Sequence, residues 1–151
     1  MATINLILKL IHIFSAIVAV GSNVTYGIWN MRAAADPPHT SFALKGIKFI
    51  DDRIANPAYG VLFLTGLIMV FTASWGFRLW VIIAIVLFIA IAVIGFAVYS
   101  PLLKRQIALA DAGDTSSPEF EGLGRRARMI GPILGLLVLV ILVMMVFKPG
   151  P

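Results

Sequence analysis

Four long apolar stretches, separated by shorter polar segments, form the most regular pattern along the chain. The third stretch is the purest, because no side chain from Val81 to Val98 carries a hydroxyl, an amide or a charge. A helix needs about 20 mainly apolar residues to cross the hydrocarbon core of a bilayer. The pattern therefore predicts four membrane-spanning helices, at approximately 4–29, 58–75, 78–103 and 127–147.

The stretches are apolar on all sides, which excludes the short alternating strands of a membrane barrel. Hydrophobic residues make up 60% of the 151 residues and charged residues only 13%, about half the charged fraction of a typical soluble domain. The surplus of apolar side chains must face lipid. We predict an all-α fold: a four-helix transmembrane bundle that forms a single integral membrane domain over residues 1–151.

The segment between the first two spans has a helical pattern of its own. Pro37 and Pro38 end the first helix, and Thr40 or Ser41 can cap a new one. Apolar residues then recur at helical spacing at Leu44, Ile47, Ile50 and Ile54. Two interpretations stand: a short amphipathic helix on the cytoplasmic surface, ended by Asn56-Pro57, or a bent extension of the second span.

The cations are distributed unevenly about the spans. Nine of the twelve lysines and arginines lie in or beside the first and third connections. These nine are Arg32, Lys45, Lys48, Arg53, Lys104, Arg105, Arg125, Arg126 and Arg128. Since positive charge marks the cytoplasmic side, we expect these connections to be cytoplasmic and both termini to be outside. The net charge of +5 then serves topology, and no nucleic-acid partner is expected.

Tryptophan and tyrosine support the same topology, because these residues prefer membrane interfaces. All six tryptophans and tyrosines of the chain fall at the end of a predicted span. Tyr26, Trp29, Tyr59 and Tyr99 lie at the predicted cytoplasmic ends, and Trp75 and Trp80 lie at the predicted outer ends.

The first span is the only one with a polar face. His12, Ser15, Ala19, Ser22, Asn23 and Tyr26 follow one another at helical steps. Polar side chains within a membrane helix are costly, so this face must point into the bundle. Its candidate cofactor-binding residues are His12, Ser15, Asn23 and Tyr26.

His12 has two interpretations. It can be an axial ligand to the metal of haem or another tetrapyrrole, or it can hydrogen-bond a neighbouring helix. The other histidine, His39, lies in the first connection, so a second ligand would be a methionine such as Met69 or Met144, or a residue of a second copy. Asn23 and Tyr26 can likewise bind a quinone headgroup or a lipid, or bond another helix.

The chain lacks the residues and motifs that most classes of enzyme and transporter need. It has no cysteine, no phosphate-binding loop and no membrane-embedded Asp, Glu, Arg or Lys besides the border residue Lys9. The leading hypothesis is a small non-catalytic accessory or structural subunit, which packs in a larger, bioenergetic membrane complex or associates with itself through the Gly131–Gly135 spacing. The alternatives are a haem- or quinone-linked membrane redox protein that uses His12, and a small lipid or metabolite carrier.

Three segments carry a resemblance to a known family. "LKLIHIFSAIVAVGSNVTYGIW", "GVLFLTGLIMVFTASWGF" and "LVMMVFKP" resemble a bacterial family of predicted integral membrane proteins, domain of unknown function 2269. The resemblance implies this architecture and a bacterial plasma (inner) membrane location. The opening "LIHIFSAIVAVG" is more distantly similar to the first helix of copper-resistance D and HemJ-type proteins, where a histidine associated with metal or haem function matches His12. HemJ-type enzymes also depend on an intramembrane lysine, for which this chain offers only Lys104 at a span border.

Overall fold

The computed structural model describes residues 2–72 and 76–149. Within these ranges the chain is helical, without strands, and four helical rods are long and apolar enough to cross a membrane. The α-helices are α1 (Ala2–Ala35), α2 (Thr40–Ile50), α3 (Asn56–Thr72), α4 (Leu79–Ile94), α5 (Ser100–Asp111) and α6 (Pro118–Phe147). A 3₁₀ turn, η1 (Pro37–His39), and two π turns, η2 (Asp51–Ala55) and η3 (Gly95–Tyr99), complete the list.

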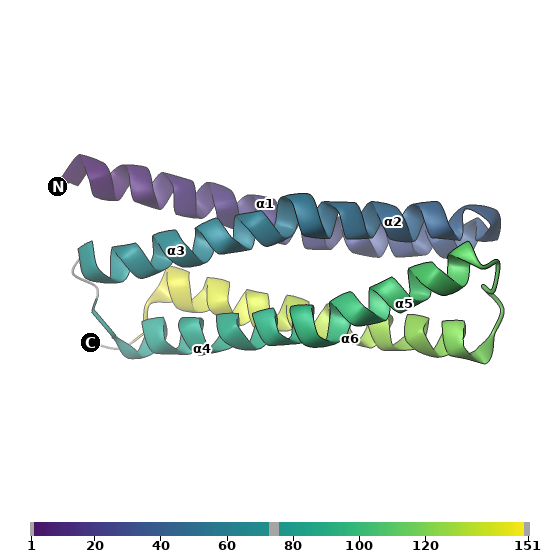
Figure 1. Ribbon diagram of the computed structural model, residues 1–151. Coiled ribbons are helices and arrows are strands. Elements are labelled where there is room, and N and C mark those ends of the chain that lie inside the picture. Colours follow the sequence, from purple (N-terminus) through teal and green to yellow (C-terminus); the bar gives the residue numbers. More distant parts are fainter. Residues whose placement is uncertain (1, 73–75, 150–151) are drawn as a thin grey trace.

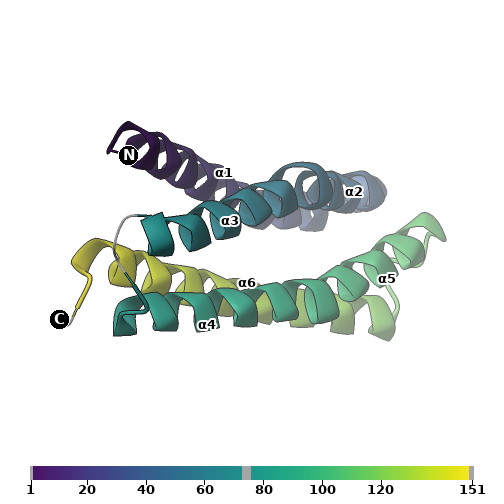
Figure 2. The ribbon, with the colours of Figure 1, turned by 60° about the vertical axis from the view of Figure 1, so that its left-hand side comes forward.

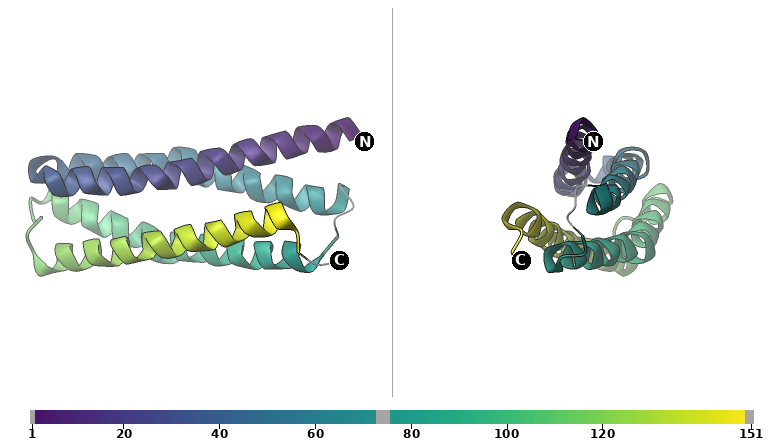
Figure 3. Two further views of the ribbon diagram at one scale, coloured as in Figure 1. Left: turned by 180° about the vertical axis from the view of Figure 1, so that it is seen from behind. Right: turned by 90° about the vertical axis from the view of Figure 1, so that its left-hand side faces the viewer.

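The rods form two antiparallel hairpins, one above the other in Figure 1. In the first hairpin α1 packs against the continuous rod α2–η2–α3, and in the second the rod α4–η3–α5 packs against α6. In the turned view of Figure 2 and in the view along the rods in Figure 3, the two hairpins form two separate layers. Both chain ends lie at the same end of the bundle, which we call the terminal end.

Each hairpin contains one rod that passes through a π turn just before a proline. The turn η2 is followed by Asn56-Pro57, and η3 is followed by Ser100-Pro101. Proline lacks an N–H and its ring clashes with the carbonyl four residues earlier. The wider π turn accommodates both defects, so the helix bends instead of ending.

The first connection consequently follows the second of its two interpretations. The segment Thr40–Ile50 is helical, but it runs on through Asn56-Pro57 into α3 as an extension of that span. Its apolar face packs against protein: Leu44 and Ile47 are buried beside Tyr26 of α1 and Leu103 of α5. Helix α2 begins at Thr40 without a side-chain cap. The Thr40 hydroxyl donates instead to the carbonyl of Ala33 in α1, at 3.1 Å.

The predicted spans lie within longer helices. The exceptions are Arg78, which precedes α4, and residues 73–75 with Trp75, which lie outside the described residues. At the other end of the bundle, which we call the charged end, the helices extend well past the predicted spans. Helix α6 begins after Ser117, whose side chain caps it by accepting from the N–H of Phe120 at 3.2 Å.

Polar contacts join the two hairpins at the charged end. Lys45 of α2 forms a 2.7 Å ion pair with Asp111 of α5, and Ser41 donates to the same carboxylate. Within the second hairpin, Arg105 of α5 pairs with Glu119 of α6 at 2.7 Å. The Lys45 ammonium and the Ser41 hydroxyl lower the pKa of Asp111, and the Arg105 guanidinium lowers that of Glu119. At the terminal end, a small apolar cluster of Val70, Trp80 and Val81 joins α3 to α4.

Candidate functional site

The polar face of α1 is turned into the bundle, as the sequence predicts. Ser15, Ala19, Ser22 and Tyr26 are each no more than 9% exposed. Neighbours between them, such as Ile17 and Val24, are more than 60% exposed and form the lipid-facing side. Helical spacing therefore separates a buried polar stripe from an apolar outer surface.

This stripe is hydrogen-bonded to the rod α2–α3 at four levels, which we call the polar ladder. The ladder consists of Asn5 with the main-chain carbonyl of Thr72, His12 with Thr65, Asn23 with Tyr59, and Tyr26 with Asp51. Three of the candidate residues, His12, Asn23 and Tyr26, are thus rungs of the ladder. The fourth, Ser15, is buried beside them.

His12 is held closely against α3. Its Nδ1 lies 3.0 Å from Thr65 Oγ1, and that hydroxyl donates to the carbonyl of Val61 at 2.7 Å. The hydroxyl oxygen is therefore an acceptor, so we assign the imidazole proton to Nδ1. A Cβ built on Gly66 would lie only 3.0 Å from His12 Cε1. Glycine at this position lets the ring lie against the helix backbone.

The space directly beside His12 is small. The ring borders a recess of about 110 Å³ whose other lining side chains are almost all apolar, whereas pockets for drug-sized ligands hold roughly 300–1,000 Å³. Met144 packs against the apolar cluster of the terminal end. Within the described residues, no three His, Cys, Asp or Glu side chains come together to hold a metal ion.

A much larger cleft, of about 1260 Å³, lies between the two hairpins. We call it the inter-hairpin cleft; its walls come from α1, α3, α4, α5 and α6. Seven residues, among them Phe63, Phe88 and Leu142, line both this cleft and the recess near His12. The recess therefore adjoins the cleft on the side of the terminal end.

Aromatic side chains bridge the hairpins along one wall of the cleft. Phe63 of α3 stacks on Phe88 of α4 with ring centroids 5.2 Å apart, and Tyr59 meets the same ring edge-on at 6.0 Å. Nearer the charged end, Tyr26 and Tyr99 stack almost parallel at 6.5 Å. The cleft is thus apolar where the phenylalanines lie and becomes polar at the tyrosine pair.

The two π turns place polar groups at this polar end. Asp51 is the first residue of η2 and accepts a hydrogen bond from the Tyr26 hydroxyl at 3.2 Å, while Tyr99 is the last residue of η3. Within the described residues, the Tyr99 hydroxyl has no hydrogen-bond partner. Asp51 and Tyr99 both line the cleft. Such π turns recur at functional sites in helical proteins.

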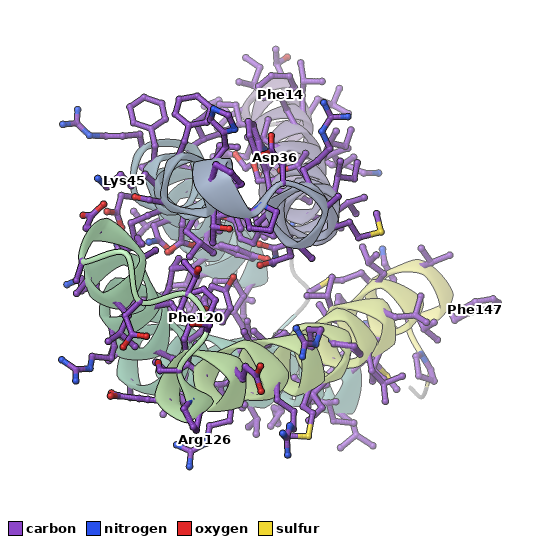
Figure 4. The ribbon with its side chains drawn as sticks, turned by 90° about the vertical axis from the view of Figure 1, so that its right-hand side faces the viewer. Phe14, Asp36, Lys45, Phe120, Arg126 and Phe147 are labelled. Carbon is purple, nitrogen blue, oxygen red and sulfur yellow. The ribbon has the colours of Figure 1, made fainter. Side chains whose placement is uncertain are left out.

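Helix α6 brings two arginines to the same end of the cleft. Arg125 and Arg128 line it, and within the described residues neither forms an ion pair. Figure 4 shows Phe120 between the hairpins and Arg126 pointing away from them. Across from α6, Gln106 of α5 is 4% exposed and lines the cleft, and its Oε1 has no hydrogen-bond partner among the described residues.

Sequence reasoning missed most of this polar end. It assigned Arg125 and Arg128 to topology and named neither Asp51 nor Gln106 as a site residue. The available signal was a proline inside each of two helical patterns, because such prolines mark the bends that bring distant polar residues together.

The comparisons with known proteins concern the chain as a whole. A family model described as "predicted integral membrane protein (DUF2269)" matches residues 6–149. No curated protein and no solved structure matches the chain. The match covers all four rods, from the first turns of α1 to the residues after α6. The chain therefore belongs to the DUF2269 family of predicted integral membrane proteins.

Proposed function

We propose that the protein is a non-catalytic membrane protein that binds an amphiphilic molecule in the inter-hairpin cleft. One observation carries the proposal: the inter-hairpin cleft is polar at the charged end of the bundle and apolar towards the terminal end. A molecule with a polar head and a long apolar tail matches both parts at once. Lipids and isoprenoid quinones belong to this class.

The dimensions of the cleft suit a long ligand. Its volume of about 1260 Å³ exceeds the roughly 300–1,000 Å³ of pockets for drug-sized molecules. Phe63, Phe88 and Ile91 line its apolar part, while Asn56 and Tyr99 line its polar part. The cleft holds no paired acid and base beside a nucleophile, which supports binding over catalysis.

Filling the cleft tests the proposal. Gly131 and Gly135 of α6 both line it, and a Cβ built on either meets no atom within 4 Å. We expect Gly131→Leu/Gly135→Leu to fold and to lose the amphiphile that is extracted with the wild-type protein after extensive detergent exchange. Mass spectrometry of the extract measures the amount of bound amphiphile. Gly21→Leu is the matched control, since Gly21 is exposed on α1 and borders neither cavity.

Two results would contradict the proposal. One is a wild-type extract without a stoichiometric amphiphile. The other is a filled variant that retains the same amount as Gly21→Leu. Thermal unfolding of both variants checks that they are folded.

An accessory subunit in a larger membrane complex is the second candidate function. The observation that favours it is α6, none of whose residues is buried, and which carries the close-approach spacing Gly131–Gly135. A partner helix on this surface would copurify with the protein in mild detergent. Gly131→Leu would reduce that copurification, and a wild-type protein that purifies alone contradicts this role.

The proposed location is the bacterial plasma membrane, with the charged end in the cytoplasm and both termini outside. The nine cations at that end support this orientation. The chain has no cysteine, so single cysteines report the topology directly. We expect a membrane-impermeant thiol reagent added to intact cells to label Phe77→Cys and to leave Ser116→Cys unlabelled; the opposite pattern overturns the orientation.

For His12 we propose a packing role instead of metal ligation. Its bond to Thr65 and the small recess beside it support this role. The purified protein is then colourless. A Soret band that disappears in His12→Ala would overturn the assignment.

A further inference from the structure

We infer that the head of the bound amphiphile is zwitterionic, with a phosphate held by Arg125 and Arg128 and a primary ammonium held by Gln106 and neighbouring carboxylates. This inference rests on the proposed function and names its ligand class: a phospholipid with a phosphoethanolamine-like head. The argument has four parts, which concern the arginines, the glutamine, the acids and the depth of the site.

The arginines supply the phosphate site. Arg125 and Arg128 are three residues apart on α6, so they lie on one face, and both line the cleft without an ion-pair partner in the described chain. A guanidinium presents a planar set of N–H donors that matches phosphate oxygens. Arg126 between them does not line the cleft and points away from the hairpins.

The glutamine supplies an acceptor that needs a donor. Gln106 is 4% exposed, and its Oε1 has no hydrogen-bond partner among the described residues. Buried acceptors are normally satisfied, because leaving one unpaired is costly. Its amide adjoins the arginine site: a Cβ built on Gly124 would lie 3.3 Å from Gln106 Nε2 and 3.5 Å from Arg128 Nη1. A ligand group that donates a hydrogen bond beside the phosphate would satisfy this acceptor.

The acids decide the charge of that donor. Asp51 and Glu121 also line the polar end of the cleft. Two cations and two acids around one cleft do not select an anion alone. They match a head that carries both signs: the arginines offer donors to its phosphate, and the acids and Gln106 Oε1 offer acceptors to its ammonium. A quinone offers neither charge.

The depth of the site matches a phospholipid in a bilayer. From Met129 to Phe147, α6 carries no charged residue, whereas Arg125, Arg126 and Arg128 lie immediately before that run. The cleft arginines thus lie at the boundary between polar and apolar surface. Basic pockets between membrane helices at this level bind phospholipid heads. The tail then extends past Phe88 and Ile91, which also line the cleft.

Titration of the delipidated protein with lipids of equal chains tests the inference by native mass spectrometry. The probes are a phosphatidylethanolamine, a phosphatidylcholine, a phosphatidylglycerol and an uncharged diacylglycerol. We expect phosphatidylethanolamine to bind about tenfold more tightly than phosphatidylcholine, whose trimethylated ammonium cannot donate a hydrogen bond. Phosphatidylglycerol, which has hydroxyl donors but no ammonium, should fall between them.

Variants assign the contributions of the residues. Arg125→Gln/Arg128→Gln should weaken all three phospholipids about tenfold and leave diacylglycerol unchanged. Arg126→Gln makes the same change of charge outside the cleft and should alter nothing. Gln106→Met and Gln106→Leu should abolish the preference for phosphatidylethanolamine over phosphatidylcholine. Two replacements of Gln106 are tested so that the lipid preference can be measured even if one of the two variants does not fold.

The outcomes separate this inference from the proposed function. Equal binding of phosphatidylethanolamine and phosphatidylcholine, or an effect of Arg126→Gln equal to that of the cleft pair, overturns the zwitterionic head. Binding of diacylglycerol that is lost in Gly131→Leu/Gly135→Leu would still uphold the amphiphile cleft. Displacement of the lipid by inorganic phosphate would instead assign the arginines to a soluble anion and overturn the inference.

Discussion

The two hairpins use opposite means to hold their helices together. In the first, the four rungs of the polar ladder tie α1 to α2–α3 along its whole length. In the second, the facing membrane parts of α4 and α6 are apolar: no polar side chain occurs from Val81 to Val98 or from Met129 to Phe147. The first hairpin has a fixed register, whereas the second is held by packing alone within the membrane.

This difference gives the two walls of the inter-hairpin cleft different properties. Hydrogen bonds in an apolar surrounding are directional, so the ladder defines one arrangement of α1 against α3. Apolar packing tolerates small shifts, and α6 has no buried residue to oppose them. The first hairpin is therefore a fixed wall and the second an adaptable one.

The largest effect is expected at the closest contact in the fixed hairpin. In Gly66→Leu, the new side chain would start 3.0 Å from His12 Cε1 and push α1 away from α3. Overpacking of this kind costs about 1–3 kcal/mol. Denaturant unfolding in micelles measures the loss. Gly21→Leu, where a Cβ meets nothing within 4 Å, should lose none; equal stability of the two variants would break the comparison.

The next effect concerns two stacked tyrosines that differ in one respect. The Tyr26 hydroxyl donates to Asp51, but the Tyr99 hydroxyl is unpaired among the described residues. Tyr26→Phe should lower the free energy of unfolding by about 1 kcal/mol, and Tyr99→Phe should leave it nearly unchanged. Both variants keep the stacked ring. If Tyr99→Phe lost more unfolding free energy than Tyr26→Phe, the Tyr26–Asp51 hydrogen bond would not be what stabilises this part of the bundle.

A smaller coupling is expected between His12 and Thr65. A double-mutant cycle with His12→Ala and Thr65→Val isolates their interaction energy from the other effects of each substitution. Hydrogen bonds between membrane helices average about 0.6 kcal/mol in such cycles. The expected coupling is of that size, measured from the unfolding of all four proteins. Additive losses would remove His12 from the ladder.

The smallest effect is the pH dependence of the contact between hairpins at the charged end. Lys45 and Ser41 lower the pKa of Asp111, so folding is favoured by its ionised form. The contribution is present above the ordinary aspartate pKa of about 3.9 and is lost as the pH falls through the lowered value. Asp111→Asn should therefore be slightly less stable than wild type at neutral pH and equally stable in strong acid. A gap that widens on acidification contradicts this sign.

The sequence predicted the parts of the fold that depend on local pattern. The apolar stretches predicted four helices, and the polar stripe of the first predicted its buried face. Each of these features depends on residues within a few turns of one another. For the same reason, the sequence left the course of the first connection open, since Asn56-Pro57 suits either a helix end or a bend.

The inter-hairpin cleft was beyond this kind of prediction. Its polar end brings together Asp51, Gln106 and Arg128 from three different rods. No spacing along the chain relates these residues; two π turns and the packing of the hairpins place them. Arg125 and Arg126 look equivalent in sequence, and only the rotation of α6 separates the cleft residue from the outer one.

The most direct test of the amphiphile-binding cleft is a photocrosslinking experiment on α4. Ala92 lines the cleft, while its neighbour Val93 does not and is 57% exposed. A diazirine side chain is placed at either position, the protein is purified, bulk lipid is removed by detergent exchange, and the sample is irradiated. The account predicts a covalent adduct of phospholipid mass at position 92 and none at position 93. Equal labelling at both positions, or none at 92, would contradict it.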